Sequence, residues 1–490
     1  MAYNLISRDR NQPFLLPPSL EDWLPQDHLV RFILDVVDRF DLAAFYRRRH
    51  EDGWGRAAYD PTMMVALLLY AYCVGVRSSR EIERRCKEDI AFRFIAANQC
   101  PDHATIARFR ADHDELLAGL FTRALALCAE AGLVRVGLVA LDSKKVRANA
   151  SMAANKTRKA IETEVRKILD EAAETDAAED RAHGRHRGDE LPEGLSDPRS
   201  RVARLEEARA RLERDERERR GAYEQRLQER RAEEERRGKR LRGRKPKPPP
   251  PAERAQANIT DPDSRIMKTQ HGFIQGYNAR PSPPMARSSW PATSPTKAAD
   301  VGHLHPMIEQ ARSNLEAAGA DPGIGVLLAN AGYYSDDNVT REGEGLPELL
   351  IATTKEWKQR KAAQAQPPRG RIPKGLTTKQ RMERKLSTKR GQSLYRKRSQ
   401  TIQPVFGQHD VRGLGRLHRR GLRGCRCEWI FENTAHNVLK LWRSRMRSRP
   451  DRAGPHDPRR AAPGSSSGRF RRGHHRRPPI SCCRRVVRAL

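Results

Sequence analysis

Two short apolar runs, each ending on a single polar residue, constrain the fold of this chain more than any other feature. The first, VRVGLVAL, ends on Asp142, and the second, VLLA, ends on Asn330 and then turns through AGYY into an acidic patch. Runs of this length that are rich in valine and leucine predict strands. A strand that delivers one polar side chain to a sheet edge is the usual place for chemistry in an α/β fold, although such a residue is also often a turn or cap residue.

The net charge indicates an anionic partner. The chain has 490 residues, enough for two or three units, and its 95 lysines and arginines against 62 acids leave a charge of +33. Nucleic acid is the leading partner because neutralising phosphates releases counterions whatever the base sequence, and an anionic membrane surface is the alternative. No apolar run approaches the roughly 18 residues of a membrane span, and the N-terminus has no signal-peptide core. We therefore expect a cytoplasmic, nucleoid-associated protein with no membrane segment.

The eight cysteines predict neither a zinc site nor a disulfide framework. They are scattered, with no pair at two-residue spacing and no matching histidine pairs. We expect most of them to be small buried residues of a protein in a reducing compartment.

Residues 1–130 predict a helical N-terminal domain that binds DNA. In DPTMMVALLLYAYCVGV, Asp60 is a plausible N-cap and Pro61 stands in the first turn. Two shorter helical patterns follow, with a break at Cys100–Pro101 and a cap at Asp102 or Thr105; the second helix would expose Arg108, Arg110 and His113. This pattern fits a helix-turn-helix reader of DNA, and it fits equally an ordinary helical bundle with a basic solvated face.

A charged insertion, residues 156–257, separates the two strand-bearing parts of the chain. It is rich in Ala, Glu and Arg, and it ends in a proline-rich spacer. Its thin apolar seam predicts a solvated helical arm or a loose coiled coil, and the seam consists of Val202, Leu205, Ala208, Leu212, Tyr223 and Leu227. Beyond it, LYRKRSQTIQPVFGQHD reads as a basic helix interrupted by Pro404, and EWIFENTAHNVLKLWR as an amphipathic helix. Residues 446–490 predict a basic disordered tail.

Several motifs, in order, resemble the insertion-sequence transposases of the DDE class with an InsH-type helical N-terminal domain. These motifs are DPTMMVALLLYAYCVGVRSSREIE, ALDSKKVRANAS, DPDSRIMKTQHGFIQGYNA, TKAADVGHLHPM, ANAGYYSDDN, PVFGQ and AHNVLKLWR. The resemblance covers roughly residues 1–155 and 258–445. It implies an α/β ribonuclease H-like catalytic domain in two parts, residues 131–155 and 258–445, split by the charged helical insertion.

The resemblance implies a catalytic site of three carboxylates that hold two Mg²⁺ ions for an in-line phosphodiester displacement. Position by position, the three family acids fall on Asp142, Asn330 and Gln403, and the family's lysine near the third acid is replaced by Asp410. These three residues are the expected catalytic and metal-binding positions. The expected DNA-contacting residues are Lys144, Lys145, Arg147, Arg108, Arg110, Arg396 and Arg398, for each of which a solvated charge is the alternative.

Two departures from the family pattern predict an impaired enzyme. Asn330 and Gln403 replace acids, so a site that should carry three negative charges keeps one, and we expect weak metal binding and little strand cleavage. We expect Asp336 and Asp337 to lie on the following turn or at the start of the next helix. From there they would not replace the missing metal-binding carboxylates. Where the fold needs another strand, residues 280–296 read RPSPPMARSSWPATSPT instead, and we interpret this segment as the product of two compensating frameshifts. Reading the coding DNA tests that interpretation.

Three functions remain open from the sequence. The first is a transposase that binds terminal inverted repeats and target DNA as a homodimer and cleaves and joins DNA with Mg²⁺. The second is a catalytically dead relative that only binds DNA. The third is a basic architectural or RNA-binding protein that acts through the arm, although basic stretches without interleaved aromatic residues argue against single-strand stacking.

Overall fold

The structure is a computed structural model of the chain, and it divides into two compact units, Met1–Ser444 and Arg445–Leu490. The account below concerns the first unit. The described residues are 19–47, 58–134, 137–168, 170, 201–241, 243, 245–251, 255–269, 271–279, 300–341, 346–354, 370, 372–373 and 375–448. Within these ranges, none of the helices combines the length and the apolar character of a membrane span. The proposed frameshifted segment, residues 280–296, and most of the C-terminal tail lie outside them.

The N-terminal part is helical, as the sequence predicts. Its helices are α1 (Leu29–Val37), α2 (Ala43–Tyr46), α3 (Pro61–Cys73), α4 (Ser79–Glu88), α5 (Ile90–Ile95), α6 (His103–Asp112) and α7 (Asp114–Glu130). Asp60 caps α3 by accepting a hydrogen bond from the Met63 amide, and Asp102 caps α6 in the same way through Thr105. Helix α3 is apolar on every side and is buried almost throughout, so it forms the centre of this helical part.

Two three-stranded sheets meet at the first predicted strand. The parallel sheet has the order β1 (Leu138–Leu141), β7 (Val326–Ala329), β8 (Glu348–Ile351), and the antiparallel sheet has the order β2 (Lys144–Arg147), β6 (Gly272–Ala279), β5 (Arg265–Thr269). Asp142 and Ser143 alone separate β1 from β2. A two-stranded sheet joins β3 (Asn155–Thr157) and β4 (Gln256–Asn258), and two short 3-10 helices are η1 (Met152–Ala154) and η4 (Asp300–His303).

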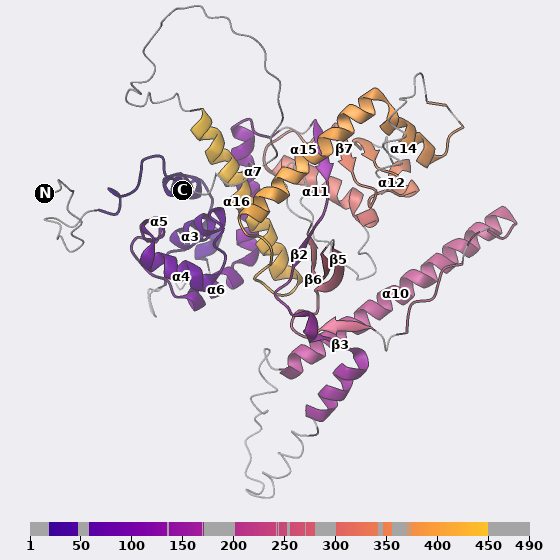
Figure 1. Ribbon diagram of the computed structural model, residues 1–490, viewed down its shortest axis with the longest axis horizontal. Helices are drawn as coiled ribbons and strands as arrows, with labels where there is room; N and C mark the ends of the chain where they lie inside the picture. Colours follow the sequence, from indigo (N-terminus) through magenta and orange to yellow (C-terminus); the bar gives the residue numbers. More distant parts are fainter. Residues whose placement is uncertain are drawn as a thin grey trace, which may run out of the picture. The chain divides into compact units, whose positions relative to one another are not determined.

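Helices cover both faces of the parallel sheet, as is usual for parallel strands (Figure 1). Helix α11 (Leu304–Ala317) packs on one face, where Val139, Leu327 and Leu349 meet its apolar side. On the other face, Ala140 and Leu328 contact Ile402 of α15 (Lys389–Val411). Helix α12 (Asp336–Thr340) follows β7, and α14 (Thr378–Ser387) precedes α15. The expected α/β architecture of this part of the chain is therefore confirmed, as a sheet between two helical layers.

The predicted break at Pro404 is wrong, because α15 continues through this residue to Val411. A proline inside a helix removes its own N–H and leaves the carbonyl one turn earlier without its partner. Pro404 and Gln400 both lie on the exposed side of α15, where water can satisfy that carbonyl. The helix therefore continues past Pro404 without interruption.

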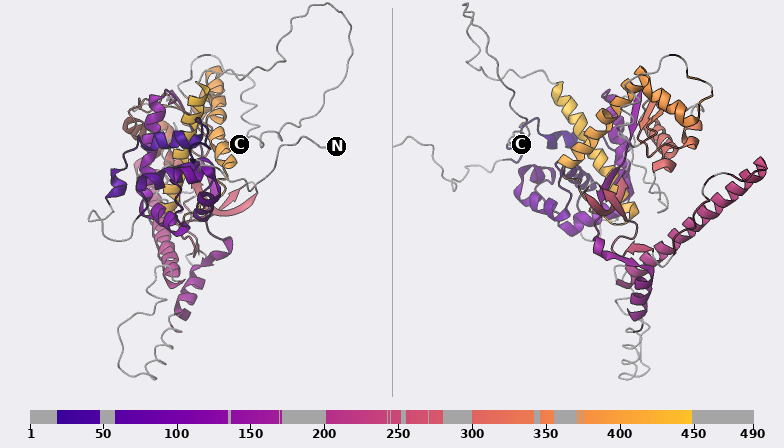
Figure 2. Two further views of the ribbon diagram at one scale, coloured as in Figure 1. Left: turned by 90° about the vertical axis from the view of Figure 1, so that its left-hand side faces the viewer. Right: turned by 45° about the vertical axis from the view of Figure 1, so that its right-hand side comes forward.

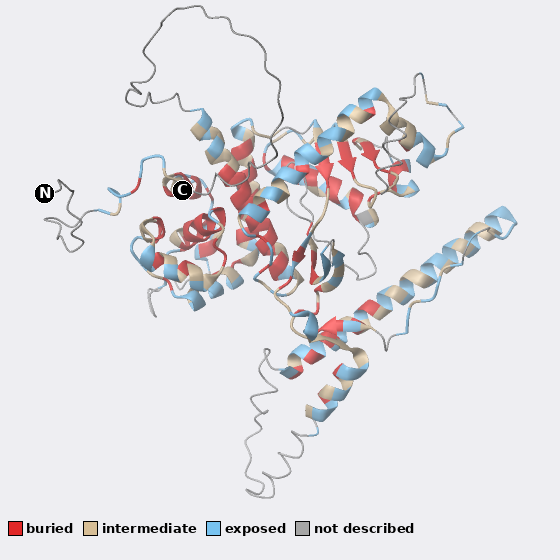
Figure 3. Cartoon of the chain, viewed as in Figure 1, coloured by how far each residue is buried: buried red, intermediate tan, exposed pale blue. Residues whose placement is uncertain are grey.

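Helix α16 (Leu422–Arg447) differs from the one-sided amphipathic helix that the sequence predicts. Every residue from Cys427 to Leu439 is buried, polar ones included (Figure 3). Phe431 and Ala435 pack with the N-terminal helices, Ile430 packs against α7, and Trp429 packs against Tyr277 of β6. A helix enclosed on all sides needs no polar face, so the pattern of its apolar residues alone does not reveal its environment.

A buried ionic network joins the N-terminal helices to the end of α15 and to α16. The Glu432 carboxylate accepts hydrogen bonds from Arg77 through Oε2 (2.8 Å from Nη2) and from Arg412 through Oε1 (2.8 Å from Nη2). The Glu432 side chain has no exposed surface, and those of Arg77 and Arg412 are 3% and 8% exposed. Arg77 also donates to the Arg412 carbonyl oxygen at 2.7 Å. The helical part is thus fixed to the α/β part by paired buried charges.

The insertion has a small core of its own. The helix of residues 158–168 lies beside the first part of α10 (Arg201–Arg237) in both views of Figure 2. Leu205, Ala208 and Leu212 are buried against Ile161 and Val165. Among the described residues, no apolar cluster includes the second half of α10, and the predicted seam residues Tyr223 and Leu227 are only half-buried. The predicted seam is therefore a packed interface over its first half alone.

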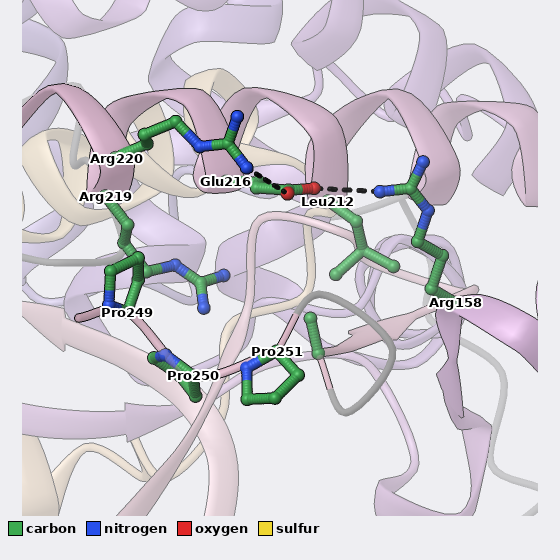
Figure 4. Close-up of a pocket in the computed structure, with 9 residues that line it drawn as sticks. Arg158, Leu212, Glu216, Arg219, Arg220, Pro249, Pro250 and Pro251 are labelled. Atoms are coloured by element: carbon green, nitrogen blue, oxygen red, sulfur yellow. Dashed lines mark hydrogen bonds and ion pairs between the residues drawn. The ribbon is translucent and has the colours of Figure 1, made fainter.

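The proline-rich spacer lies against α10. Pro249, Pro250 and Pro251 line a small hollow together with Leu212 and with Glu216, whose carboxylate lies 2.8 Å from Nη1 of Arg158 (Figure 4). The spacer therefore runs back along the helix that precedes it.

Two buried histidines predict a loss of stability in acid. Burial, aided by the neighbouring His436, Arg412, Lys144 and Arg77, holds the pKa of His409 well below its usual value, and burial lowers the pKa of His436 to about 3. Above pH 6.5 both imidazoles are mostly neutral in the folded and in the unfolded protein. Below pH 6.5 only the unfolded chain protonates these imidazoles, so the free energy of unfolding decreases as the pH falls. Each histidine should cost about 2 kcal/mol of unfolding free energy between pH 7.5 and 5.

The variant His409→Phe tests this expectation. The His409 ring lies between Trp429 and His436, with ring centroids 5.2 Å and 5.5 Å away, so an apolar ring suits this position. Neither nitrogen of His409 has a hydrogen-bond partner in the described part of the chain. Urea unfolding at pH 7.5 and 5 should show a smaller loss of stability for the variant by about 2 kcal/mol. An identical loss in the two proteins would contradict the assignment.

Candidate functional site

The structure brings Asp142 and Asn330 together, as the sequence predicts. Each residue directly follows a strand, Asp142 after β1 and Asn330 after β7, and these parallel strands pair with Leu141 opposite Ala329. The carboxyl ends of parallel strands lie at the same edge of a sheet. As a result, Nδ2 of Asn330 donates a hydrogen bond of 2.9 Å to Oδ1 of Asp142.

Both oxygens of Asp142 already have partners. Oδ1 also accepts a hydrogen bond of 2.9 Å from the Ser143 amide, and Oδ2 accepts one of 2.7 Å from Nη1 of Arg398. The Arg398 and Asp142 side chains are 18% and 19% exposed. A charge-assisted hydrogen bond between two such partly buried side chains is among the stronger polar contacts in proteins. The guanidinium group therefore neutralises the carboxylate of Asp142.

Helix α15 fixes the position of Arg398. Ile402, one turn further along, is buried against the sheet, and the Tyr395 hydroxyl donates a hydrogen bond of 3.1 Å to the Ala329 carbonyl oxygen. The Arg398 guanidinium lies 6.0 Å from the centre of the Tyr395 ring. The sequence predicts that Arg398 contacts DNA phosphate, but in the structure its guanidinium is bonded to Asp142 instead.

Gln403 does not join Asp142 and Asn330. It follows the buried Ile402, and neighbouring residues in a helix point about 100° apart, so Gln403 lies on the exposed side of α15. Within the described residues its side chain makes no hydrogen bond with Asp142 or Asn330. The structure thus assembles two of the three positions that the family resemblance implies.

The basic residues near the site fall into two groups. Lys144 lies 2.5 Å from Oδ1 of Asp410 and donates to the Phe406 carbonyl oxygen, and its side chain is only 14% exposed. Lys145 donates to the Lys268 carbonyl oxygen. Lys145, Arg147 and Arg396 are all exposed, whereas Lys144 is not. The Lys144–Asp410 pair was not predicted, although the loss of the family's lysine at position 410 was its signal in the sequence.

The predicted exposed face of α6 is wrong for two of its three residues. His113 is buried, with its ring 5.3 Å from the Phe45 ring, and Arg110 donates to the Arg77 carbonyl oxygen at 2.7 Å and to the Ser79 hydroxyl. Both side chains therefore stabilise the packing of the helices. Arg108 is exposed, as expected.

Nearby acids do not complete the site. Asp336 and Asp337 lie exposed in the first turn of α12, where Asp336 accepts a hydrogen bond from the Tyr334 hydroxyl, as the sequence places them. Across the described ranges, no group of three or more His, Cys, Asp or Glu side chains is arranged to hold a metal ion. The six cysteines described are free, and five of them are buried, which confirms the expected burial for these residues.

The residues at this site do not fit a pair of Mg²⁺ ions. Mg²⁺ needs several oxygen ligands in octahedral geometry, and two such ions need negative charge to hold them together. The single carboxylate of Asp142 faces an arginine, and the Asn330 amide directs its N–H₂ group to Asp142 while its oxygen accepts from the Gly332 amide at 2.8 Å. A cation would have to displace Arg398 and turn the amide.

Comparison with known families agrees with the resemblance of the motifs. Residues 18–112 match a transposase domain (DUF772), and residues 359–442 match a transposase DDE domain. No curated protein and no solved structure matches the chain. The two matched domains, in this order, support a relationship to the DDE transposases of insertion sequences. A DDE domain implies a divalent metal, typically Mg²⁺, and the transposase family implies DNA binding.

Proposed function

We propose that this chain binds the terminal inverted repeats of an insertion sequence, as a homodimer that holds two ends, and no longer cleaves DNA. In this proposal, β1 and β7 belong to a ribonuclease H-like domain. One observation carries the proposed loss of cleavage: Asp142, the remaining family acid, is neutralised by Arg398 and bonded to the Asn330 amide. A site closed in this way offers no charge to a metal ion.

Binding to DNA rests on the surplus of positive charge and on exposed arginines in both matched domains. Arg108 lies on α6 within the first domain, and Arg396 lies on α15 within the second. Arg147 is exposed at the end of β2. Contacts between arginine and phosphate fix a protein on the DNA backbone. Each phosphate that is neutralised makes the affinity depend more steeply on salt concentration.

The experiment measures binding and nicking together on a duplex taken from the DNA that flanks the gene. A scrambled duplex of equal length serves as the control. We expect tighter binding to the native end, affinity that falls steeply with salt, and no nicked product with Mg²⁺ or Mn²⁺. Cleavage of the native end would contradict the proposed loss of catalysis. Equal affinity for the two duplexes would instead favour the architectural alternative, and a lack of binding at low salt would refute DNA binding altogether.

A further inference from the structure

A basic hollow of about 600 Å³ lies beyond the candidate site, at the far end of β2. It is lined by residues from segments distant in the sequence, among them Arg147, Met152, Phe273, Arg416 and Arg420. The hollow is of the size that holds small organic ligands in proteins. The arrangement cannot be recognised from any single stretch of sequence, because the arginines and the aromatic ring come from different parts of the chain.

The backbone holds these segments in place. The Arg147 amide donates to the Gly415 carbonyl oxygen at 3.4 Å, and the Leu417 amide donates to the Arg147 carbonyl oxygen at 2.8 Å. Leu414 and Leu417 are buried against Val146. The segment that bears Arg416 is therefore anchored along β2, and its arginine has a defined place at the hollow.

The lining is positively charged. It contains three arginines and no carboxylate. Arg420 donates through Nε to the Asn149 carbonyl oxygen at 3.1 Å, which leaves its terminal nitrogens for other partners. In the described part of the chain, none of the three arginines forms an ion pair with an acid. Uncompensated guanidinium groups that line a hollow favour an anionic occupant such as phosphate.

Phe273 gives the hollow a second, apolar character. It lies near the turn of the β5–β6 hairpin and is 61% exposed, the second most exposed large apolar side chain among those described. Met152, on the same lining, is 44% exposed. Exposed aromatic rings beside arginines are the usual platform for unpaired bases, since every base has a face that can stack.

We propose that this hollow binds an unpaired segment of DNA next to the duplex end, with Phe273 stacked on a base and the arginines on its phosphates. This inference rests on the proposed function. Arg147 stands five residues after Asp142, at the end of β2, and is at most about 16 Å away at 3.3 Å per residue. At 3.4 Å per base pair that distance is about five base pairs. The hollow and the Asp142 site can therefore contact one DNA end together.

The test compares two 12-nucleotide DNA strands of equal charge, one of mixed sequence and one without bases, by fluorescence anisotropy. The variant Phe273→Ala should bind the mixed-sequence strand about 5- to 150-fold more weakly than the unaltered chain, because stacking is worth about 1–3 kcal/mol per base. Its affinity for the base-free strand should not change. Phe273→Trp should restore binding, and Ile266→Ala, which removes a 44% exposed side chain from neighbouring β5, is the matched control.

The arginines give an independent readout. The double variant Arg416→Ala, Arg420→Ala should weaken binding of both strands and should reduce the slope of log affinity against log salt by about 1.4, at 0.7 for each single-strand phosphate contact. If Phe273→Ala loses equal affinity for the two strands, or loses none, the inference is overturned. If the unaltered chain binds the native duplex end while Phe273→Ala has no effect, the inference alone fails. If the chain binds no DNA at low salt, the proposed function fails with it.

Discussion

Replacing Glu432 with glutamine is expected to destabilise the protein by about 3–5 kcal/mol. Glu432 is the shared partner of Arg77 and Arg412, and the three side chains are almost fully buried. The variant Glu432→Gln keeps the shape of the side chain but leaves two arginines without their counter-charge in a place that water does not reach. Urea unfolding of the full chain measures the change in the free energy of unfolding.

The matched control is Glu130→Gln, which breaks the exposed ion pair with Arg39, whose partners are 58% and 57% exposed. Exposed pairs typically contribute about 0–1 kcal/mol, so this variant should unfold close to the unaltered chain. Similar small effects of the two substitutions would show that the network at Glu432 does not hold the helical and α/β parts together. A variant too unstable to purify agrees with the expectation, and Glu432→Asp then measures a milder loss of the same contacts.

Restoring the family acid by Asn330→Asp is expected to destabilise the metal-free protein by about 1–3 kcal/mol at pH 8. The substitution replaces the hydrogen bond from Nδ2 to Oδ1 of Asp142 by two facing carboxylates, with Arg398 as their shared counter-charge. The like charge raises the pKa of the introduced carboxyl above its unfolded value. Its cost is therefore largest at high pH and shrinks as the pH falls toward 4. Millimolar Mn²⁺ should recover part of the loss at pH 8 by binding between the carboxylates.

The variant Asn330→Ala separates charge from the loss of the amide. It removes the same hydrogen bond and adds no carboxylate, so its destabilisation should depend on neither Mn²⁺ nor the protonation of a new acid. Thermal unfolding of both variants at pH 5 and 8, with and without Mn²⁺, makes the comparison. If Asn330→Asp is as stable as the unaltered chain in metal-free buffer at pH 8, the amide does not complete the site as described.

The strands around the site could be predicted because their residues carry the signal locally. The apolar runs before Asp142 and Asn330 end where β1 and β7 end, the predicted cap at Asp60 is correct, and Asp102 is the cap of the two residues considered for α6. Parallel pairing then required the two polar residues to meet. The α/β character of this part follows from the same reasoning, while the ribonuclease H-like fold remains a proposal.

The surroundings of those residues could not be predicted, because they depend on packing between distant segments. Arg398 and Arg110 belong to basic stretches of sequence, yet each is bonded within the protein. Pro404 stays inside α15 because its side of the helix is exposed. Helix α16 is enclosed by segments that cannot be identified from its own sequence. The aromatic residue of the basic hollow, Phe273, lies far in sequence from Arg416.

The most direct test of the closed site is a titration of the full chain with Mn²⁺, followed by the loss of the electron paramagnetic resonance signal of free Mn²⁺. Because Arg398 and the Asn330 amide hold both oxygens of Asp142, we predict no saturable binding up to millimolar Mn²⁺. The variant Asn330→Asp, which places a second carboxylate beside Asp142, serves as the comparison, and it should bind Mn²⁺ more tightly than the unaltered chain. Saturable binding of Mn²⁺ by the unaltered chain that Asp142→Asn abolishes would contradict the closed site.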